Sequence, residues 1–144
     1  MKRVHRSAIV ECAPEAFYDL VMDIESYPDF LPWCEAARIL ERAEDRLIAG
    51  MTLGYRGIRQ SLTTRNTLEA GRAMDMTLVE GPFRKFHARW HFLPLGEAAC
   101  KAEFTLEYEF ASATLGRLLG PLFERIADTI VEAFMRRRET LSRP

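Results

Sequence analysis

The sequence predicts an α+β fold in which a seven-stranded antiparallel sheet wraps around one long C-terminal helix. Three observations predict it: apolar residues recur with a period of two through most of residues 36–110, short turn segments separate these runs, and a 3.6-residue apolar stripe fills residues 115–141. The turns are too short for parallel crossovers, which need a dozen residues or more. A chain of 144 residues suits one domain, spanning residues 1–144.

The N-terminal third predicts a strand, a helix and a compact loop. Residues 3–10 alternate imperfectly and form the expected first strand. A helix is expected over residues 14–24, where Pro14 suits the first turn and an apolar stripe follows, made of Phe17, Leu20, Val21 and Ile24. Residues 26–34 contain two prolines four positions apart, which exclude a long helix. A short helical turn or a packed loop remains there, so the expected order is β-α-α-β6-α.

The middle of the chain predicts six strands: 36–43, 46–54, 58–69, 72–80, 85–93 and 100–110. The last is the clearest, because apolar residues from Cys100 to Phe110 alternate with polar ones. Antiparallel sheets commonly pack one face against the core and expose the other to water.

The apolar stripe over residues 115–141 predicts a helix that covers the apolar face of the sheet. Gly120-Pro121 interrupts the stripe, so we expect a short first piece and a main helix over about 121–141. The main helix would be roughly 30 Å long. A twisted sheet and a straight helix diverge, and the wedge between them predicts a pocket for an apolar ligand.

Charge, cysteines and the N-terminus limit the function classes. Ten acids fall in residues 11–45 and seven bases in residues 56–89, with a further basic cluster at Arg136–Arg138. These arginines are either solvated strand faces or a basic interaction surface. Cys12, Cys34 and Cys100 lack zinc or redox spacing and are expected to be free thiols. We find no secretion signal or apolar span, which predicts a cytoplasmic protein and leaves peripheral membrane contact open.

Catalytic and metal motifs are missing from the sequence. It contains no phosphate-binding loop, nucleophile elbow or zinc-binding helix motif. His87 and His91 lie on one expected strand, roughly 13 Å apart, which is too far to share a metal. Among inward-facing positions, Tyr108 and Glu80 are the only acid–base candidates we find. We therefore expect no catalytic residue, metal or cofactor, and no enzyme activity.

Five segments in register carry a family resemblance. They are Tyr27–Cys34 (YPDFLPWC), Thr63–Asn66 (TTRN), Glu80–Lys85 (EGPFRK), Trp90–Leu95 (WHFLPL) and Ala99–Lys101 (ACK), with Val131–Phe134 (VEAF) following in the terminal helix. The chain thereby resembles the START-like (SRPBCC, helix-grip, Bet v 1-like) family, which includes coenzyme Q-binding proteins, polyketide cyclase-like proteins and ribosome association toxins. The second and third segments favour the ribosome association toxin branch, whereas Trp33 stands where a glycine is expected in some of its members.

The resemblance implies a non-enzymatic ligand-binding domain. Its first implication is binding of ubiquinone or a related isoprenoid lipid in support of respiration, with that quinone as ligand rather than cofactor. The alternative is a toxin that binds the large ribosomal subunit and blocks subunit association. A polyketide cyclase-type enzyme is a third interpretation, and DNA is not an expected partner.

The candidate ligand-binding residues are the large apolar side chains of the 27–34 loop, the inward strand faces and the terminal helix. They are Tyr27, Phe30, Leu31, Trp33, Phe83, Trp90, Phe92, Tyr108, Phe123, Ile130 and Phe134. Aromatic residues dominate cores whether or not a ligand binds, so ordinary core packing is the alternative for each.

Overall fold

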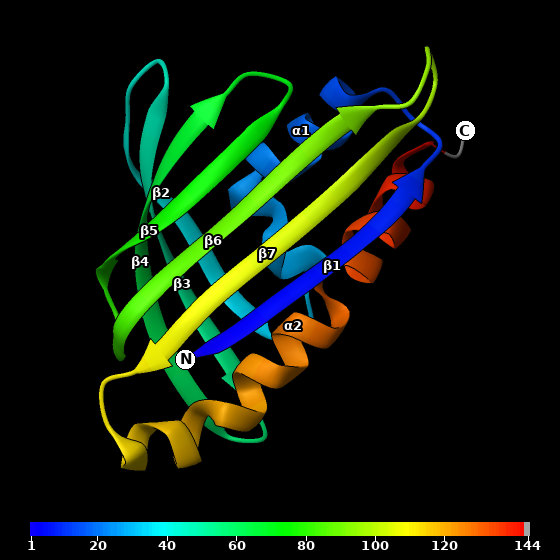
Figure 1. The fold of residues 1–144 in the computed structure, drawn as a ribbon. Helices are drawn as coiled ribbons and strands as arrows, with labels where there is room; N and C mark the ends of the chain where they lie inside the picture. The colour runs from blue at the N-terminus through cyan, green and yellow to red at the C-terminus, as the bar shows by residue number, and fades with distance from the viewer. Residues whose placement is uncertain (143–144) are drawn as a thin grey trace.

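Seven antiparallel strands form one sheet that curves around the C-terminal helix in the computed structural model, which describes residues 1–142 (Figure 1). The strands are β1 (Lys2–Val10), β2 (Cys34–Arg42), β3 (Arg46–Tyr55), β4 (Ile58–Glu69), β5 (Ala73–Glu80), β6 (Phe83–Pro94) and β7 (Cys100–Phe110). Their order across the sheet is β1-β7-β6-β5-β4-β3-β2, so the sheet is open and β1 and β2 are its edges. The predicted fold class and antiparallel hairpin order are confirmed.

Two short helices connect β1 to β2. Helix α1 spans Pro14–Met22 and the 3-10 helix η1 spans Ile24–Asp29. The expected helix over 14–24 ends two residues early, because Asp23 leaves helical geometry at φ −79° and ψ 62° and its N–H bonds back to Leu20 at 3.3 Å. The helical-turn alternative for residues 26–34 is correct for the part that η1 covers.

Helix α2 spans Ala113–Ser142 without interruption, so the predicted break at Gly120-Pro121 is wrong. Proline removes one backbone hydrogen bond and strains a helix interior. The flanking residues Leu119, Leu122 and Phe123 are nevertheless fully buried, and their packing holds the helix together through that point. Figure 1 shows the first turns, in gold, lying at an angle to the orange remainder, as a proline kink produces.

Strand boundaries differ from the expected ones where bulges occur. Strand β2 begins at Cys34 rather than residue 36, and its register shifts between Cys34 and Ala36. Strand β6 begins at Phe83 rather than residue 85, with a shift between Phe83 and Lys85. A bulge inserts an unpaired residue and breaks the period of two, which hides the strand's start from pattern analysis.

Both edge strands are covered or charged. On the β1 side, Lys2 pairs with Glu124 of α2 at 3.3 Å and Arg6 pairs with Asp128 at 3.0 Å. On the β2 side, η1 lies against the strand, and the Ile39 N–H donates to Glu25 Oε2 at 3.1 Å. Edge strands that are covered or that carry charged side chains resist pairing with a strand of another chain.

The core lies between the concave face of the sheet and α2, with α1 closing the end near β6 and β7. All three cysteines are buried free thiols, as predicted. The outer face of the sheet is ionic in its β5–β6 region, where Asp75 pairs with His87 at 2.7 Å and also with Arg89.

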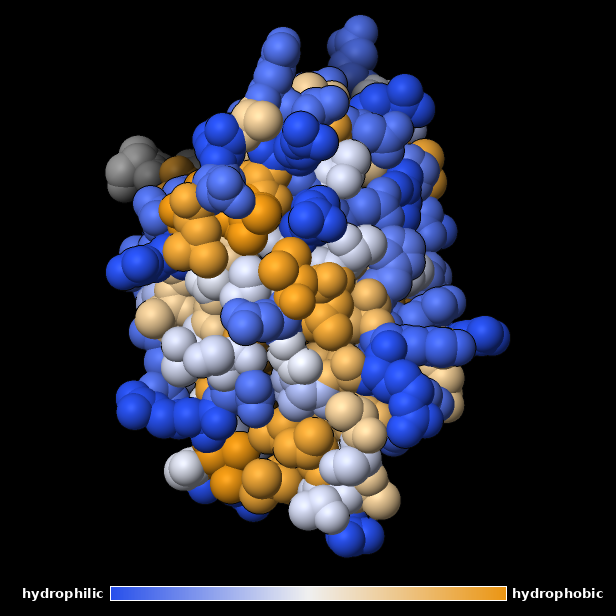
Figure 2. Space-filling model, turned by 90° about the vertical axis from the view of Figure 1, so that its left-hand side faces the viewer, coloured by the Kyte–Doolittle hydropathy of each residue, from blue (hydrophilic) through white to orange (hydrophobic). Residues whose placement is uncertain are grey.

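Apolar side chains on the side shown in Figure 2 form several separate orange patches, interrupted by white and blue residues. Within residues 1–142, no helix has the length and apolar character to cross a bilayer.

Candidate functional site

A narrow apolar cavity of about 60 Å³ lies between the concave face of the sheet and α2, where the wedge was predicted. Side chains from η1, the loop after it, five strands and α2 line it. The lining residues are Tyr27, Leu31, Trp33, Met51, Leu53, Leu62, Met76, Phe86, Ala88, Trp90, Phe104, Leu106, Phe123, Ile126, Ile130 and Phe134.

Seven of the eleven candidate residues line this cavity. They are Tyr27, Leu31, Trp33, Trp90, Phe123, Ile130 and Phe134. They meet because the 27–33 segment folds over one side of α2 while β6 crosses the other. Phe134 shows this directly, since its ring contacts those of Tyr27 at 5.4 Å and Trp90 at 5.2 Å. Ligand binding by these residues stays a prediction.

The other four candidates lie outside the lining. Phe30 is half-buried on the outer side of α2, with its ring 5.1 Å from that of Phe134. Phe83 and Tyr108 pack on Phe123, with centroid separations of 4.9 and 5.8 Å. Phe92 packs on α1, and its ring lies 5.6 Å from that of Phe17. These four pack against neighbouring rings, and a part for them in ligand binding stays a prediction.

Sequence reasoning missed the lining residues contributed by β3, β4 and β5. These are Met51 and Leu53 of β3, Leu62 of β4 and Met76 of β5. The period of two marks them as inward-facing, but only the sheet's curvature determines which inward positions reach the helix at its midpoint.

The two polar groups that reach the cavity wall are bonded elsewhere. The Tyr27 hydroxyl donates to the Val21 carbonyl, and burial raises the pKa of Tyr27 far above its usual value. The Trp33 indole N–H donates to Thr129 Oγ1 at 3.0 Å. The lining contains no Asp, Glu, His, Lys or Arg within the described chain. Such a wall suits an apolar chain and supplies no charged acid or base.

The other reactive groups are also poorly placed for chemistry. Burial raises the pKa of the Cys34 thiol to about 11, which leaves it protonated and a weak nucleophile at neutral pH. Tyr108 lies outside the cavity lining, and Glu80 is exposed. No cluster of three potential metal ligands occurs among residues 1–142.

A buried polar pair lies on β4 beyond Leu62. Thr64 Oγ1 donates to Asn66 Oδ1 at 2.7 Å, and Asn66 Nδ2 lies 3.4 Å from Met74 Sδ. Both residues are at most 2% exposed, whereas Arg65 between them points outward. The TTRN segment therefore contributes Thr64 and Asn66 to the interior and Arg65 to the surface.

The cavity is small compared with sites that hold whole ligands. Pockets for drug-sized ligands measure roughly 300–1,000 Å³. A volume of about 60 Å³ accommodates a few methylene groups, and a larger ligand requires the walls to move. Two lining residues, Met51 and Met76, have the unbranched side chains that adapt most readily to such movement.

Comparison with known proteins places this geometry in a family. The family model for polyketide cyclase / dehydrase and lipid transport matches residues 10–135. The ribosome association toxin RatA of Pseudomonas aeruginosa is 41% identical over 138 residues, covering 96% of each chain. The mitochondrial coenzyme Q-binding protein COQ10 homolog B of Xenopus laevis is 23% identical over 89% of this chain and 54% of its own.

A solved structure supports the fold independently. The Zhui aromatase/cyclase of a Streptomyces species superposes with a TM-score of 0.86 at 18% identity, covering 99% of this chain and 96% of its own. At that identity the likeness concerns the fold alone.

Proposed function

The chain belongs to the polyketide cyclase / dehydrase and lipid transport family, and on that premise we propose that it acts as a ribosome association toxin, binding the large ribosomal subunit and blocking subunit joining. One observation carries the proposal: the 41% identity to the Pseudomonas toxin extends over 96% of both chains. The match thus includes the sheet, the 27–34 segment and the terminal helix.

The dimensions of the cavity support this proposal over a carrier function. A protein that blocks subunit joining needs an exposed contact surface, whereas a quinone carrier needs interior volume. The cavity of about 60 Å³ is far below the roughly 300 Å³ at which ligand pockets begin.

A subunit-joining assay tests the proposal. Purified large and small subunits are mixed at a Mg²⁺ concentration that permits association, with and without the protein, and separated on a sucrose gradient. We expect free subunits to accumulate in proportion to added protein, and the protein to sediment with the large subunit. Unchanged association at a tenfold excess of protein over ribosomes, with the heat-unfolded chain as control, contradicts the proposal.

A second candidate function is binding of a ubiquinone-like isoprenoid. The uncharged cavity wall and the distant similarity to a coenzyme Q-binding protein favour it. Each buried CH₂ contributes about 0.8 kcal/mol, so even a short stretch of tail would bind. Organic extraction of freshly purified protein, followed by mass spectrometry, should recover quinone in near-stoichiometric amount. Repeated absence of any isoprenoid speaks against this candidate.

Cyclase activity has less support. The family description includes polyketide cyclases, which need an acid or base beside the substrate. Because the cavity lining in the described chain lacks charged side chains, we propose no cyclisation step.

A further inference from the structure

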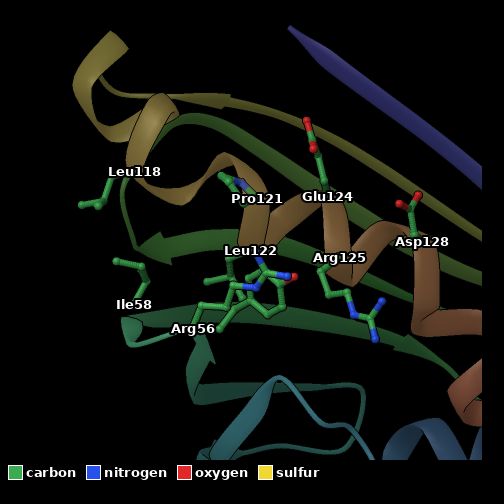
Figure 3. Close-up of a pocket in the computed structure, with 9 residues that line it drawn as sticks. Arg56, Ile58, Leu118, Pro121, Leu122, Glu124, Arg125 and Asp128 are labelled. Atoms are coloured by element: carbon green, nitrogen blue, oxygen red, sulfur yellow. The ribbon is translucent and has the colours of Figure 1, made fainter.

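Two surface grooves lie along α2, and Arg125 lines both of them. The first, of about 460 Å³, lies between the β3–β4 turn and the first half of the helix (Figure 3). The second, of about 490 Å³, lies between the η1–β2 segment and the second half. Arg125 lines both, so the two grooves are neighbours, and we refer to them together as the α2 channel.

Each half of the α2 channel contains an arginine stacked on an aromatic ring. The Arg56 guanidinium lies 5.1 Å from the ring centroid of Tyr55, and the Arg137 guanidinium lies 5.1 Å from that of Phe30. A guanidinium plane and an aromatic ring are both surfaces on which nucleic acid bases stack.

The charge along the α2 channel is positive once its ion pairs are considered. Three lining carboxylates are engaged: Glu124 with Lys2 at 3.3 Å, Asp128 with Arg6 at 3.0 Å and Glu132 with Arg136 at 2.5 Å. Figure 3 shows Glu124 and Asp128 pointing away from Arg56 and Arg125.

Three arginines of the α2 channel have no ion-pair partner within residues 1–142. Arg56, Arg125 and Arg137 form no ion pair with any residue of the described chain, and Arg137 Nε is buried without a hydrogen-bond partner there. Their charges are available to phosphate groups, and Asp29 is the one lining carboxylate within that part of the chain that lacks a neutralising partner.

The backbone at Arg56 is held in an unfavourable conformation. Its φ of +50° is a region that side chains other than Gly, Asn and Asp rarely occupy. Arg56 and Gly57 are the two central residues of the β3–β4 hairpin, and a two-residue hairpin turn of this type requires positive φ at both. The turn places a guanidinium over Tyr55 at the end of the channel.

From these contacts we propose that the α2 channel binds single-stranded RNA, with phosphates on Arg56, Arg125 and Arg137 and bases stacked at Tyr55 and Phe30. Leu118 to Thr140 marks its length along the helix, which at 1.5 Å per residue is about 33 Å, enough for several nucleotides. Under the proposed function, on which this assignment rests, the RNA is an unpaired segment of ribosomal RNA in the large subunit.

Ultraviolet crosslinking locates the contact. The intact protein is bound to purified large subunits, irradiated and digested, and peptides carrying a nucleotide are identified by mass spectrometry. We expect nucleotides on the peptides containing Tyr55 or Phe30. Crosslinks confined to peptides from the outer face of the sheet, or formed only with ribosomal proteins, overturn the inference.

Substitutions in the α2 channel provide the second readout. Arg56→Gly removes a cation while allowing the positive φ, so its chain should fold as well as the wild type. Arg125→Gln removes an exposed charge. Each should weaken large-subunit binding by about tenfold and lower the salt dependence by about one phosphate contact. The control Arg65→Gln, an exposed arginine on the outer face of β4, should bind as the wild type does.

The outcomes separate this inference from the proposed function. If the wild type binds large subunits and both channel variants bind equally well, the inference fails and the function stands. If the wild type does not bind subunits, a fluorescent ten-nucleotide oligouridine decides the inference by itself. Binding that Arg56→Gly weakens supports it, and binding only to duplex RNA, or only to vesicles containing anionic phospholipid, refutes it.

Discussion

The indole N–H of Trp33 donates a hydrogen bond of 3.0 Å to Thr129 Oγ1, joining the cavity wall to the outer channel. Trp33 lines the interior cavity, and Thr129 lines the outer groove between α2 and the η1–β2 segment. The hydroxyl of Thr129 in turn donates to the Arg125 carbonyl at 2.6 Å. These two hydrogen bonds connect the segment after η1 to the middle of α2.

Thr129→Val should therefore destabilise the fold, because it leaves a buried indole N–H without a partner. An unsatisfied buried donor costs about 1–3 kcal/mol. Urea unfolding measures the change in the free energy of unfolding. Thr140→Val is the matched control, since the Thr140 hydroxyl also donates to a carbonyl one turn back but accepts no side-chain hydrogen bond from residues 1–142. Equal losses in both variants would contradict a role for the Trp33 contact.

Ala88→Val should be tolerated, because Ala88 faces the cavity and the added methyl groups can occupy empty space. The same substitution at Ala102, which is 0% exposed and outside the lining, should cost about 1–3 kcal/mol through overpacking. The two free energies of unfolding, measured side by side, test whether the cavity is present in solution. A comparable loss at both positions would mean that it is filled.

Arg56→Gly should leave the free energy of unfolding unchanged or raise it. Glycine adopts positive φ readily, which offsets its larger entropy in the unfolded chain. Arg59→Gly, three positions along in β4, should instead cost about 0.5–1 kcal/mol in a strand interior and more through loss of the Glu35 ion pair. If Arg56→Gly proves the more damaging change, the backbone at Arg56 is not strained.

The sheet could be predicted because a period of two is a local property of the sequence. Strands β4 and β7 occur at the residues expected, since their alternation is uninterrupted. The starts of β2 and β6 could not be predicted, because bulges at Glu35 and Arg84 break that period. The continuity of α2 through Pro121 was missed for a different reason, because it depends on tertiary packing around Leu119 and Leu122.

The candidate site could be predicted only in part, since facing inward and lining a void are different properties. Trp90 and Phe92 lie on one face of β6, yet only Trp90 reaches the cavity, because α1 covers Phe92. The α2 channel was not predicted from the sequence. Arg56 and Arg125 are 69 positions apart in the chain, and the fold alone brings them to one groove.

Alkaline pH should weaken the fold through its buried thiols. Burial raises the pKa of Cys34 and of Cys100 from 9.0 to about 11, so the folded chain keeps these protons longer than the unfolded chain does. Between pH 9 and 11 the unfolded chain binds fewer protons, and the free energy of unfolding should fall as the pH rises. Urea titrations at pH 7, 9, 10 and 11 measure this decline. In the Cys34→Ala variant the decline should be shallower, and an unchanged slope would show that other groups cause it.

Phe134→Ala should be among the most destabilising single changes in α2. The ring of Phe134 is 1% exposed and contacts four others, those of Phe17, Tyr27, Phe30 and Trp90. Removal of a buried phenylalanine side chain costs about 3–5 kcal/mol, with part of that cost due to the void left behind.

That void would merge with the existing cavity, so Phe134→Ala should also bind a small apolar probe such as benzene or xenon more tightly than the wild type. Calorimetry or a probe-dependent rise in melting temperature measures this gain. Phe92→Ala is the matched control, because Phe92 is equally buried but lies outside the lining. It should lose similar stability without a comparable gain in probe binding at the cavity. If the two variants gain equally in probe binding, the space between sheet and helix binds a ligand no more readily than the rest of the core does.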